Sequence, residues 1–208
     1  MKNLTVIEHP VIKRDLTILR DRSTSNGVFR STLRRISGVM AFEVTRDLQL
    51  RPTSVRTPLE KTAGFALADD IVIVPVLRAG LGLLDGFLDL LPESRVGHVG
   101  LYRNESTLEP VDYYSKFPRS LNRSLVLLLD PMLATGGSGA AAITFLKRKG
   151  AKRIRFVTLL AAPEGVRRVT RAHPDVRIFS TVLDRALNKH GYILPGLGDA
   201  GDRIFGTD

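Results

Sequence analysis

The sequence contains no cysteine and no tryptophan, and only 6% of its 208 residues are aromatic. Without cysteine there are no disulfide bonds, no thiolate metal ligands and no cysteine nucleophile, which agrees with a cytoplasmic protein. Basic and aromatic residues are not interleaved as they are in a base-stacking surface for nucleic acid. No apolar run approaches the ~18–20 residues that span a bilayer, and the N-terminus has no secretory signal pattern. We therefore expect a cytoplasmic protein with no membrane contact.

The charge is strongly unbalanced, with a net value of +10 and with 23 arginines against 8 lysines. An anionic partner, either nucleic acid or a phosphorylated small molecule, is one interpretation. An arginine-rich surface without a specific partner is the other. The basic residues are spread from Lys2 to Arg203 and form no tail or cluster, so nucleic acid is the less favoured partner.

The length of 208 residues and an apolar content of 43% fit one globular domain. Short apolar runs rich in β-branched residues alternate with helical patterns from residue 70 onward, which predicts an α/β fold with a doubly wound, mostly parallel sheet and flanking helices. The predicted strands are Ile71–Val76, Val96–Leu101, Leu125–Leu129, Ile154–Leu160 and Val176–Val182, and the predicted helices between them are Leu81–Leu91, Gly137–Lys149 and Glu164–Arg171.

Two further helical patterns open the chain. The second runs from Val28 to Leu48, with apolar residues three and four positions apart along one face. Polar residues at 23–26 are candidate caps, and Arg51-Pro52 is expected to end the helix because a residue before proline avoids the helical region. We expect a helical N-terminal arm to about residue 50, a core over about 70–185 and a C-terminal hood over about 186–208.

A long polar segment, Tyr102–Asn122, interrupts this alternation. Loops of this length in compact domains usually have a function, often as a lid or hairpin over a site. We expect this segment to cover the ligand site.

The segment Asp130–Ser138, DPMLATGGS, joins a predicted strand to a predicted helix. Paired glycines let backbone N–H groups turn inward, and the helix N-terminus adds partial positive charge. Hydroxyl groups at Thr135 and Ser138 can donate to phosphate oxygens, while the carboxylate of Asp130 can accept from sugar hydroxyls. The segment therefore predicts a site for a ribose 5-phosphate.

Three other interpretations of this loop are weaker. A Walker A loop requires a lysine after the glycines, which is absent here. A nucleophile elbow, G-x-S-x-G, nearly matches Gly136–Ala140, with Asp184 and His190 following in hydrolase order, but Ala140 replaces the last glycine. A glycine-rich turn without any ligand is the third.

Two arginines follow neighbouring predicted strands, namely Arg78 in VLRAGLG and Arg103 in LYRNE. An isolated arginine is more often a surface ion-pair partner than a ligand contact. Together, however, two guanidinium groups near a phosphate loop could clamp a pyrophosphate through bidentate bonds. The glycines at 80, 82 and 86 resemble a dinucleotide fingerprint, but the last gap is one residue too long.

The C-terminal stretch from Gly191, GYILPGLGDAGDRIFGTD, is rich in glycine and shows no helix or strand pattern. Its apolar residues, such as Ile193 and Leu197, should anchor it as a structured lid. Backbone groups in such a turn can recognise the edge of a flat heterocycle.

Taken together, the chain resembles the uracil phosphoribosyltransferases, a branch of the type I phosphoribosyltransferase family. The matching stretches cover essentially the whole chain: HP at 9–10, VLRAGLG at 76–82, GLYRNESTLEPVDYYSKFP at 100–118, DPMLATGGS at 130–138, AAPEG at 161–165 and HGYILPGLGDAGDRIFGT at 190–207.

The resemblance implies roles for individual residues. For phosphoribosyl pyrophosphate (PRPP) it implies Arg78, Arg103, Asp130, Pro131, Met132, Leu133, Ala134, Thr135, Gly136, Gly137, Ser138 and Asp199. For uracil it implies Tyr192, Ile193, Gly198, Asp199 and Ala200, mostly through backbone groups. Arg103 and Asp130 are the implied catalytic residues, through charge stabilisation and positioning, and no general base is evident. Pro131 replaces the second acidic residue of many relatives, so no direct metal ligand is implied.

The implied reaction joins uracil to the ribose of PRPP and gives UMP and pyrophosphate, with Mg²⁺ carried by PRPP. The resemblance also implies a homodimer or a larger homo-oligomer, and it suggests GTP as a candidate activator. An RNA-binding regulator of pyrimidine metabolism on the same fold is the alternative function, favoured by the charge and opposed by the dispersed arginines.

Overall fold

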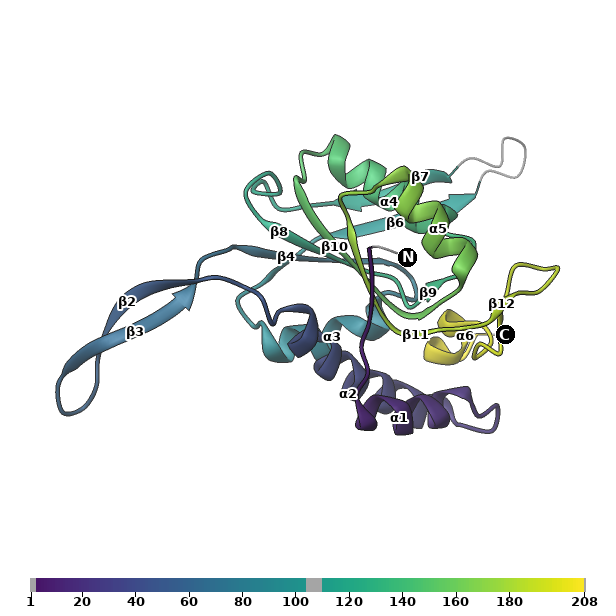
Figure 1. Ribbon diagram of the computed structural model, residues 1–208, viewed down its shortest axis with the longest axis horizontal. Helices are drawn as coiled ribbons and strands as arrows, with labels where there is room; N and C mark the ends of the chain where they lie inside the picture. The colour runs from purple at the N-terminus through teal and green to yellow at the C-terminus, as the bar shows by residue number, and fades with distance from the viewer. Residues whose placement is uncertain (1–2, 104–109, 208) are drawn as a thin grey trace.

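The computed structural model describes residues 3–103 and 110–207, and the side chains of residues 101–103 and 110–112 lie outside that description. Within these ranges the chain forms a nine-stranded sheet with helices on both faces (Figure 1). The main path runs β1 (Leu4–Val6), β11 (Arg177–Leu183), β10 (Arg153–Ala161), β8 (Leu125–Leu129), β4 (Ile71–Leu77), β6 (His98–Arg103) and β7 (Pro110–Lys116). All neighbours on this path are parallel except β6 and β7. The predicted doubly wound, mostly parallel α/β fold is confirmed.

Alternate residues of the central strands enter two separate cores. In β8, Leu125, Leu127 and Leu129 join one core, whereas Val126 and Leu128 join the other. Successive side chains of a strand point to opposite faces, so a strand covered on both sides is apolar throughout. The first core lies under α1 (Pro10–Arg20), α2 (Asn26–Val44), α3 (Leu81–Leu90) and α6 (Ala200–Phe205), and the second under α4 (Gly137–Arg148) and α5 (Pro163–Ala172).

The N-terminal helices agree with the prediction in number but not in their ends. Helix α2 stops at Val44, four residues before the predicted Leu48. Thr45 leaves the helical conformation with φ −104° and ψ 2°, and its hydroxyl donates to the Ala41 carbonyl at 2.7 Å. Leu48 still packs against the first core from outside the helix, which explains why the apolar periodicity overran. Ser25 occupies the N-cap position without a side-chain cap bond.

The polar segment after β6 is partly a hairpin. Strand β7 pairs antiparallel with β6, from His98 opposite Lys116 to Arg103 opposite Pro110. The expected strand Val96–Leu101 is divided at Gly97 between a short strand β5 (Arg95–Val96) and β6. Residues 104–109, where the predicted lid would have its tip, lie outside the described residues.

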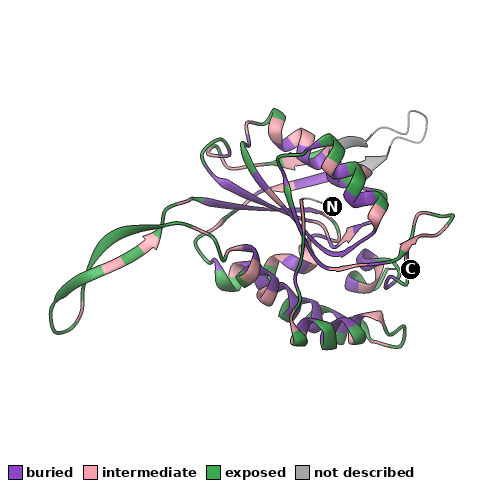
Figure 2. Ribbon diagram, in the orientation of Figure 1, coloured by how far each residue is buried: buried purple, intermediate pink, exposed green. Residues whose placement is uncertain are grey.

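An arm of two strands, absent from the prediction, projects from the body at the left of Figure 1. It pairs β2 (Leu50–Arg56) with β3 (Lys61–Leu67) in antiparallel register. Figure 2 shows the arm largely exposed on both faces. Leu59 at its turn is 95% exposed and Phe65 is 71% exposed. Because neither face is buried, the sequence has no apolar alternation to mark these strands.

The C-terminal segment is more regular than the prediction of no helix or strand. Strand β12 (Ala186–Leu187) pairs with β13 (Ile193–Leu194), and α6 follows. The Asp199 carboxylate caps α6 by accepting from the Asp202 N–H at 3.0 Å. Both guanidinium termini of Arg20 reach the buried Asp184, at 2.6 and 3.0 Å, and so attach this segment to α1.

Candidate functional site

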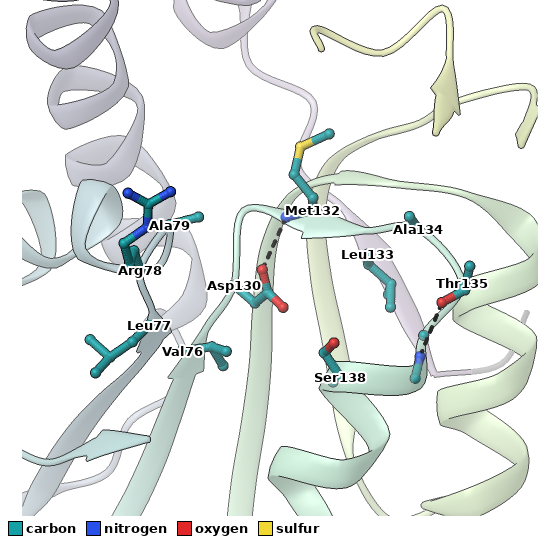
Figure 3. A pocket seen from close by; sticks show the side chains of 13 residues that line it. Val76, Leu77, Arg78, Ala79, Asp130, Met132, Leu133, Ala134, Thr135 and Ser138 are labelled. Carbon is teal, nitrogen blue, oxygen red and sulfur yellow. Dashed lines mark hydrogen bonds between the residues drawn. The ribbon is translucent and has the colours of Figure 1, made fainter. Parts of the chain in front are cut away.

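A pocket opens at the carboxyl ends of β4 and β8, which are neighbours in the sheet (Figure 3). In open α/β sheets this edge is where ligands bind. The described residues that line it are Val76, Leu77, Arg78, Ala79, Asp130, Met132, Leu133, Ala134, Thr135, Gly136, Gly137, Ser138 and Gly139. The structure therefore brings Arg78 to the same pocket as the loop 130–138, although 52 positions separate Arg78 from Asp130.

The backbone conformation of the loop leaves N–H groups at the start of α4 without partners within the helix. Gly136 has φ 76°, a left-handed conformation that favours glycine. Helix α4 begins at Gly137 with no side-chain cap, and the Gly137 N–H reaches Thr135 Oγ1 only at 3.5 Å. First-turn N–H groups of a helix have no partner within the helix, and the helix dipole adds positive charge there. The loop is thus built to receive an anion.

Pro131 differs from its neighbours because it is buried and is not among the residues that line the pocket. Its carbonyl oxygen accepts from the N–H groups of Leu159 and Leu160, at 3.0 and 2.9 Å. Met132 and Leu133 then form a short strand, β9 (Met132–Leu133), parallel to β10. Pro131 therefore fixes the loop to the sheet and leaves the pocket to the residues on either side of it.

Asp130 lies at the start of the loop and faces the pocket (Figure 3). Burial raises the pKa of its carboxyl group to about 6, and a bond accepted from the Met132 N–H at 3.3 Å opposes this only in part. The group is therefore ionised at neutral pH and becomes protonated in mild acid. An ionised carboxylate here can accept hydrogen bonds from the hydroxyl groups of a sugar.

Arg78 is turned towards α6, and in Figure 3 its guanidinium group extends away from Ser138. It donates to Asp202 Oδ1 and Thr207 Oγ1, both at 3.4 Å, and it lies 5.7 Å from the centre of the Phe205 ring. The side chain is 57% exposed, so these contacts leave donors free for a ligand. The second predicted arginine, Arg103, ends β6, and its side chain lies outside the described residues.

A second pocket adjoins the first and shares Ala79, Asp130, Met132 and Ala134 with it. The C-terminal segment supplies the rest of its lining, namely His190, Gly191, Tyr192, Ile193, Gly198, Asp199, Ala200 and Gly201. All five residues predicted to contact a base therefore line one pocket, beside the loop predicted to hold a ribose phosphate.

Some lining residues were not predicted, notably Ala79 and Gly201. Both lie inside the stretches VLRAGLG and GDAGD, and a β-carbon added to Gly201 would lie 3.9 Å from that of Ala79. This contact brings the start of α3 against the start of α6. Both stretches are rich in small residues, and this pattern could have predicted that the two segments pack closely.

The rival interpretations of the glycines lose support. A β-carbon on Gly82 would meet the side chains of Ile204 and Leu33 at 2.6 and 2.7 Å, so this glycine allows α3 to pack closely. The Asp184 carboxylate is occupied by Arg20 and by the Gly196 N–H at 3.0 Å. Among the described residues no hydrogen bond joins Asp184 to a histidine, as a hydrolase triad would require.

Residues that could hold a metal ion are sparse in this region. No group of three or more His, Asp or Glu side chains with suitable geometry occurs in residues 3–103 and 110–207. Mg²⁺ usually keeps several waters and binds substrate phosphates with few protein ligands. Asp130 is the carboxylate that lines the phosphate pocket.

The chain is similar along almost its whole length to proteins of one known family. The family model described as uracil phosphoribosyltransferase matches residues 6–207. The chain belongs to the uracil phosphoribosyltransferase family. The uracil phosphoribosyltransferase of Finegoldia magna is 53% identical, and the match covers 100% of both chains.

Two solved structures have a similar fold. The AQ2163 protein from Aquifex aeolicus superposes with a TM-score of 0.92 at 39% identity, over 97% of each chain. A hypoxanthine-guanine phosphoribosyltransferase from Bacillus anthracis superposes with a TM-score of 0.52 at 12% identity, over 76% of this chain and 80% of the other. This second likeness concerns the fold alone.

Proposed function

We propose that the protein transfers the 5-phosphoribosyl group from PRPP to uracil, giving UMP and pyrophosphate. The observation that carries the proposal is the continuity of the two pockets, which share Ala79, Asp130, Met132 and Ala134. A ribose 5-phosphate held by the loop 130–138 would thereby present its anomeric carbon to a base held by the C-terminal segment. Family membership names the base and the reaction.

The loop and Asp130 hold the phosphoribosyl donor in this proposal. Backbone N–H groups from Thr135 to Ser138 bind the 5-phosphate, and the Asp130 carboxylate accepts from the ribose hydroxyls. Fixing both groups also places the anomeric carbon, because the sugar is held at two points. Positioning of this kind removes much of the entropic barrier to a reaction between two substrates.

Arg78 and Arg103 stabilise the leaving pyrophosphate. The exposed guanidinium group of Arg78 lies at the rim of the pocket and is held by weak contacts only, so it can turn to a phosphate ligand. Arg103 takes its role from the resemblance of its motif. Mg²⁺ bound with PRPP would neutralise further charge on the pyrophosphate. Donors aimed at the leaving oxygen favour the transition state over the bound substrate.

The hood over residues 186–208 selects the base. Tyr192, Ile193 and residues 198–200 line the second pocket, where backbone groups are the main polar partners for a flat ring. The Asp199 carboxylate caps α6, and the residue lines the second pocket. Activation by GTP and a cytoplasmic location follow from the resemblance and the composition, and they remain predictions.

We also infer a homo-oligomer, in which the β2–β3 arm contacts a second copy. The arm exposes Leu50, Val55, Leu59 and Phe65. An isolated two-stranded hairpin is marginally stable in water, and exposed apolar patches on soluble proteins usually mark interfaces. A second copy of the chain fits the oligomeric habit that the resemblance implies.

Mixing the protein with uracil, PRPP and Mg²⁺ should yield UMP and pyrophosphate in equal amounts, measured by chromatography. Asp130→Ala and Arg103→Ala should each lower kcat/KM by on the order of a hundredfold or more while the far-UV circular dichroism stays unchanged. Turnover of a purine or of orotate, with none of uracil, would refute the proposal.

A further inference from the structure

Helix α5 begins in direct contact with the phosphate loop. Gly165, in its first turn, lies so close that an added β-carbon would be 2.8 Å from the Leu133 carbonyl oxygen and would also overlap that of Ala134. From the other side, a β-carbon on Gly136 would lie 2.7 Å from the Gly165 carbonyl oxygen. No side chain fits between the loop and the first turn of α5, so the backbone of this turn has a fixed position relative to the loop.

This contact places Arg168, three positions after Gly165, beside the two glycines of the loop. Its β-carbon is 3.2 Å from the position that a β-carbon of Gly136 would occupy. The Nη1, Cζ and Nη2 atoms are 3.4, 3.6 and 3.7 Å from the corresponding position at Gly137. Three nearly equal distances mean that the plane of the guanidinium group faces Gly137. The positive charge therefore lies over the N-terminus of α4.

Arg168 has no acceptor among the described residues. Glu164 precedes it by four positions on the same helix, a spacing that favours ion pairs. The Glu164 carboxylate instead lies 3.5 Å from the Leu187 N–H, from which it accepts. Across the part of the chain that the structure describes, Arg168 forms no hydrogen bond or ion pair, and the side chain is exposed. The guanidinium group thus lies beside Gly137, outside the residues that line the pocket, and its donors are not occupied by any described residue.

We infer that Arg168 is a further PRPP-binding residue, which contributes a guanidinium group to the 5-phosphate from outside the loop 130–138. The inference rests on the proposed function, because it assumes that the loop holds this phosphate. A guanidinium group can donate to a phosphate through two parallel bonds, and it retains its charge at every working pH. Since the site is open to solvent, we expect a gain in affinity of about three- to tenfold.

The chain offers a matched control in Arg167, the preceding residue. Both arginines are exposed on α5, and consecutive helical residues point about 100° apart around the axis. Arg168→Gln and Arg167→Gln remove the same charge from almost the same place. We expect Arg168→Gln to raise KM for PRPP about three- to tenfold with kcat and the KM for uracil unchanged. Arg167→Gln should change none of them, and Arg168→Lys should recover most of the loss.

Binding of two separate ligands makes the test independent of turnover. By calorimetry, Arg168→Gln should weaken ribose 5-phosphate by the same factor and leave pyrophosphate unaffected, whereas Arg78→Gln should do the opposite. Equal effects of Arg168→Gln and Arg167→Gln, or equal weakening of both ligands, would overturn the inference. If the native protein bound ribose 5-phosphate but did not turn over uracil, only the proposed function would fail. If it bound no ribose 5-phosphate, both would fail.

Discussion

Replacing Asp130 with asparagine should make the protein more stable and much less active. In the proposed function the carboxylate binds the ribose hydroxyls, but burial raises its pKa to about 6. Keeping the group ionised at neutral pH therefore destabilises the native state. Asparagine has the same shape and no charge, so it removes this destabilisation together with the ionised acceptor.

The magnitude follows from the shift in pKa. A folded pKa of about 6 against an ordinary value of 3.8 means that the native state binds more protons than the unfolded state between these values. The free energy of unfolding consequently falls as pH rises from about 4 to about 6. Above pH 6 the ionised carboxylate lowers it by a constant amount. A pKa that is about two higher in the folded than in the unfolded state corresponds to a destabilisation of ~3 kcal/mol. Because the pocket is in contact with solvent, we expect a smaller destabilisation of about 2 kcal/mol.

The assay is thermal unfolding of both proteins at one protein concentration, at pH 8 and at pH 5. At pH 8 the variant should melt about 4–8 °C higher, and at pH 5 about half of this gain should remain. In the native enzyme kcat/KM for PRPP should fall below about pH 6, as Asp130 becomes protonated. A gain that is equal at the two pH values, or no gain at all, would refute the assignment of a buried, destabilising charge to Asp130.

Two other predictions concern the hood and the arm. Arg20→Gln should lower the free energy of unfolding by about 3–5 kcal/mol, because Asp184, only 5% exposed, loses its guanidinium partner. Urea denaturation would measure this loss. The KM for uracil should rise as well. The exposed pair of Arg34 and Asp89 is the control, and Arg34→Gln should cost less than about 1 kcal/mol. Phe65→Glu should lower the sedimentation coefficient towards that of the monomer and change the melting temperature of the monomer by no more than about 2 °C. An unchanged sedimentation coefficient would exclude this face of the arm from the interface.

Local patterns were enough to predict the core of the fold. Five apolar runs between residues 71 and 182 gave the main strands, because a strand buried on both faces must be apolar at every position. The loop Asp130–Ser138 was predicted for a similar reason, since its glycines and hydroxyl groups act within nine consecutive residues. Prediction was weaker where no face is buried, as in the β2–β3 arm, and where an apolar residue beyond the helix still packs on the core, as Leu48 does.

The pairing of distant groups was decided only by tertiary structure. That Asp130 lines both pockets, that Arg78 rests on α6 and that Arg168 faces Gly137 all depend on how helices pack across the sheet. These distances join residues far apart in sequence, and small residues such as Gly165 set them by allowing one backbone to approach another. The sequence by itself determined which chemical groups each segment carries. Packing determined which of those groups lie side by side.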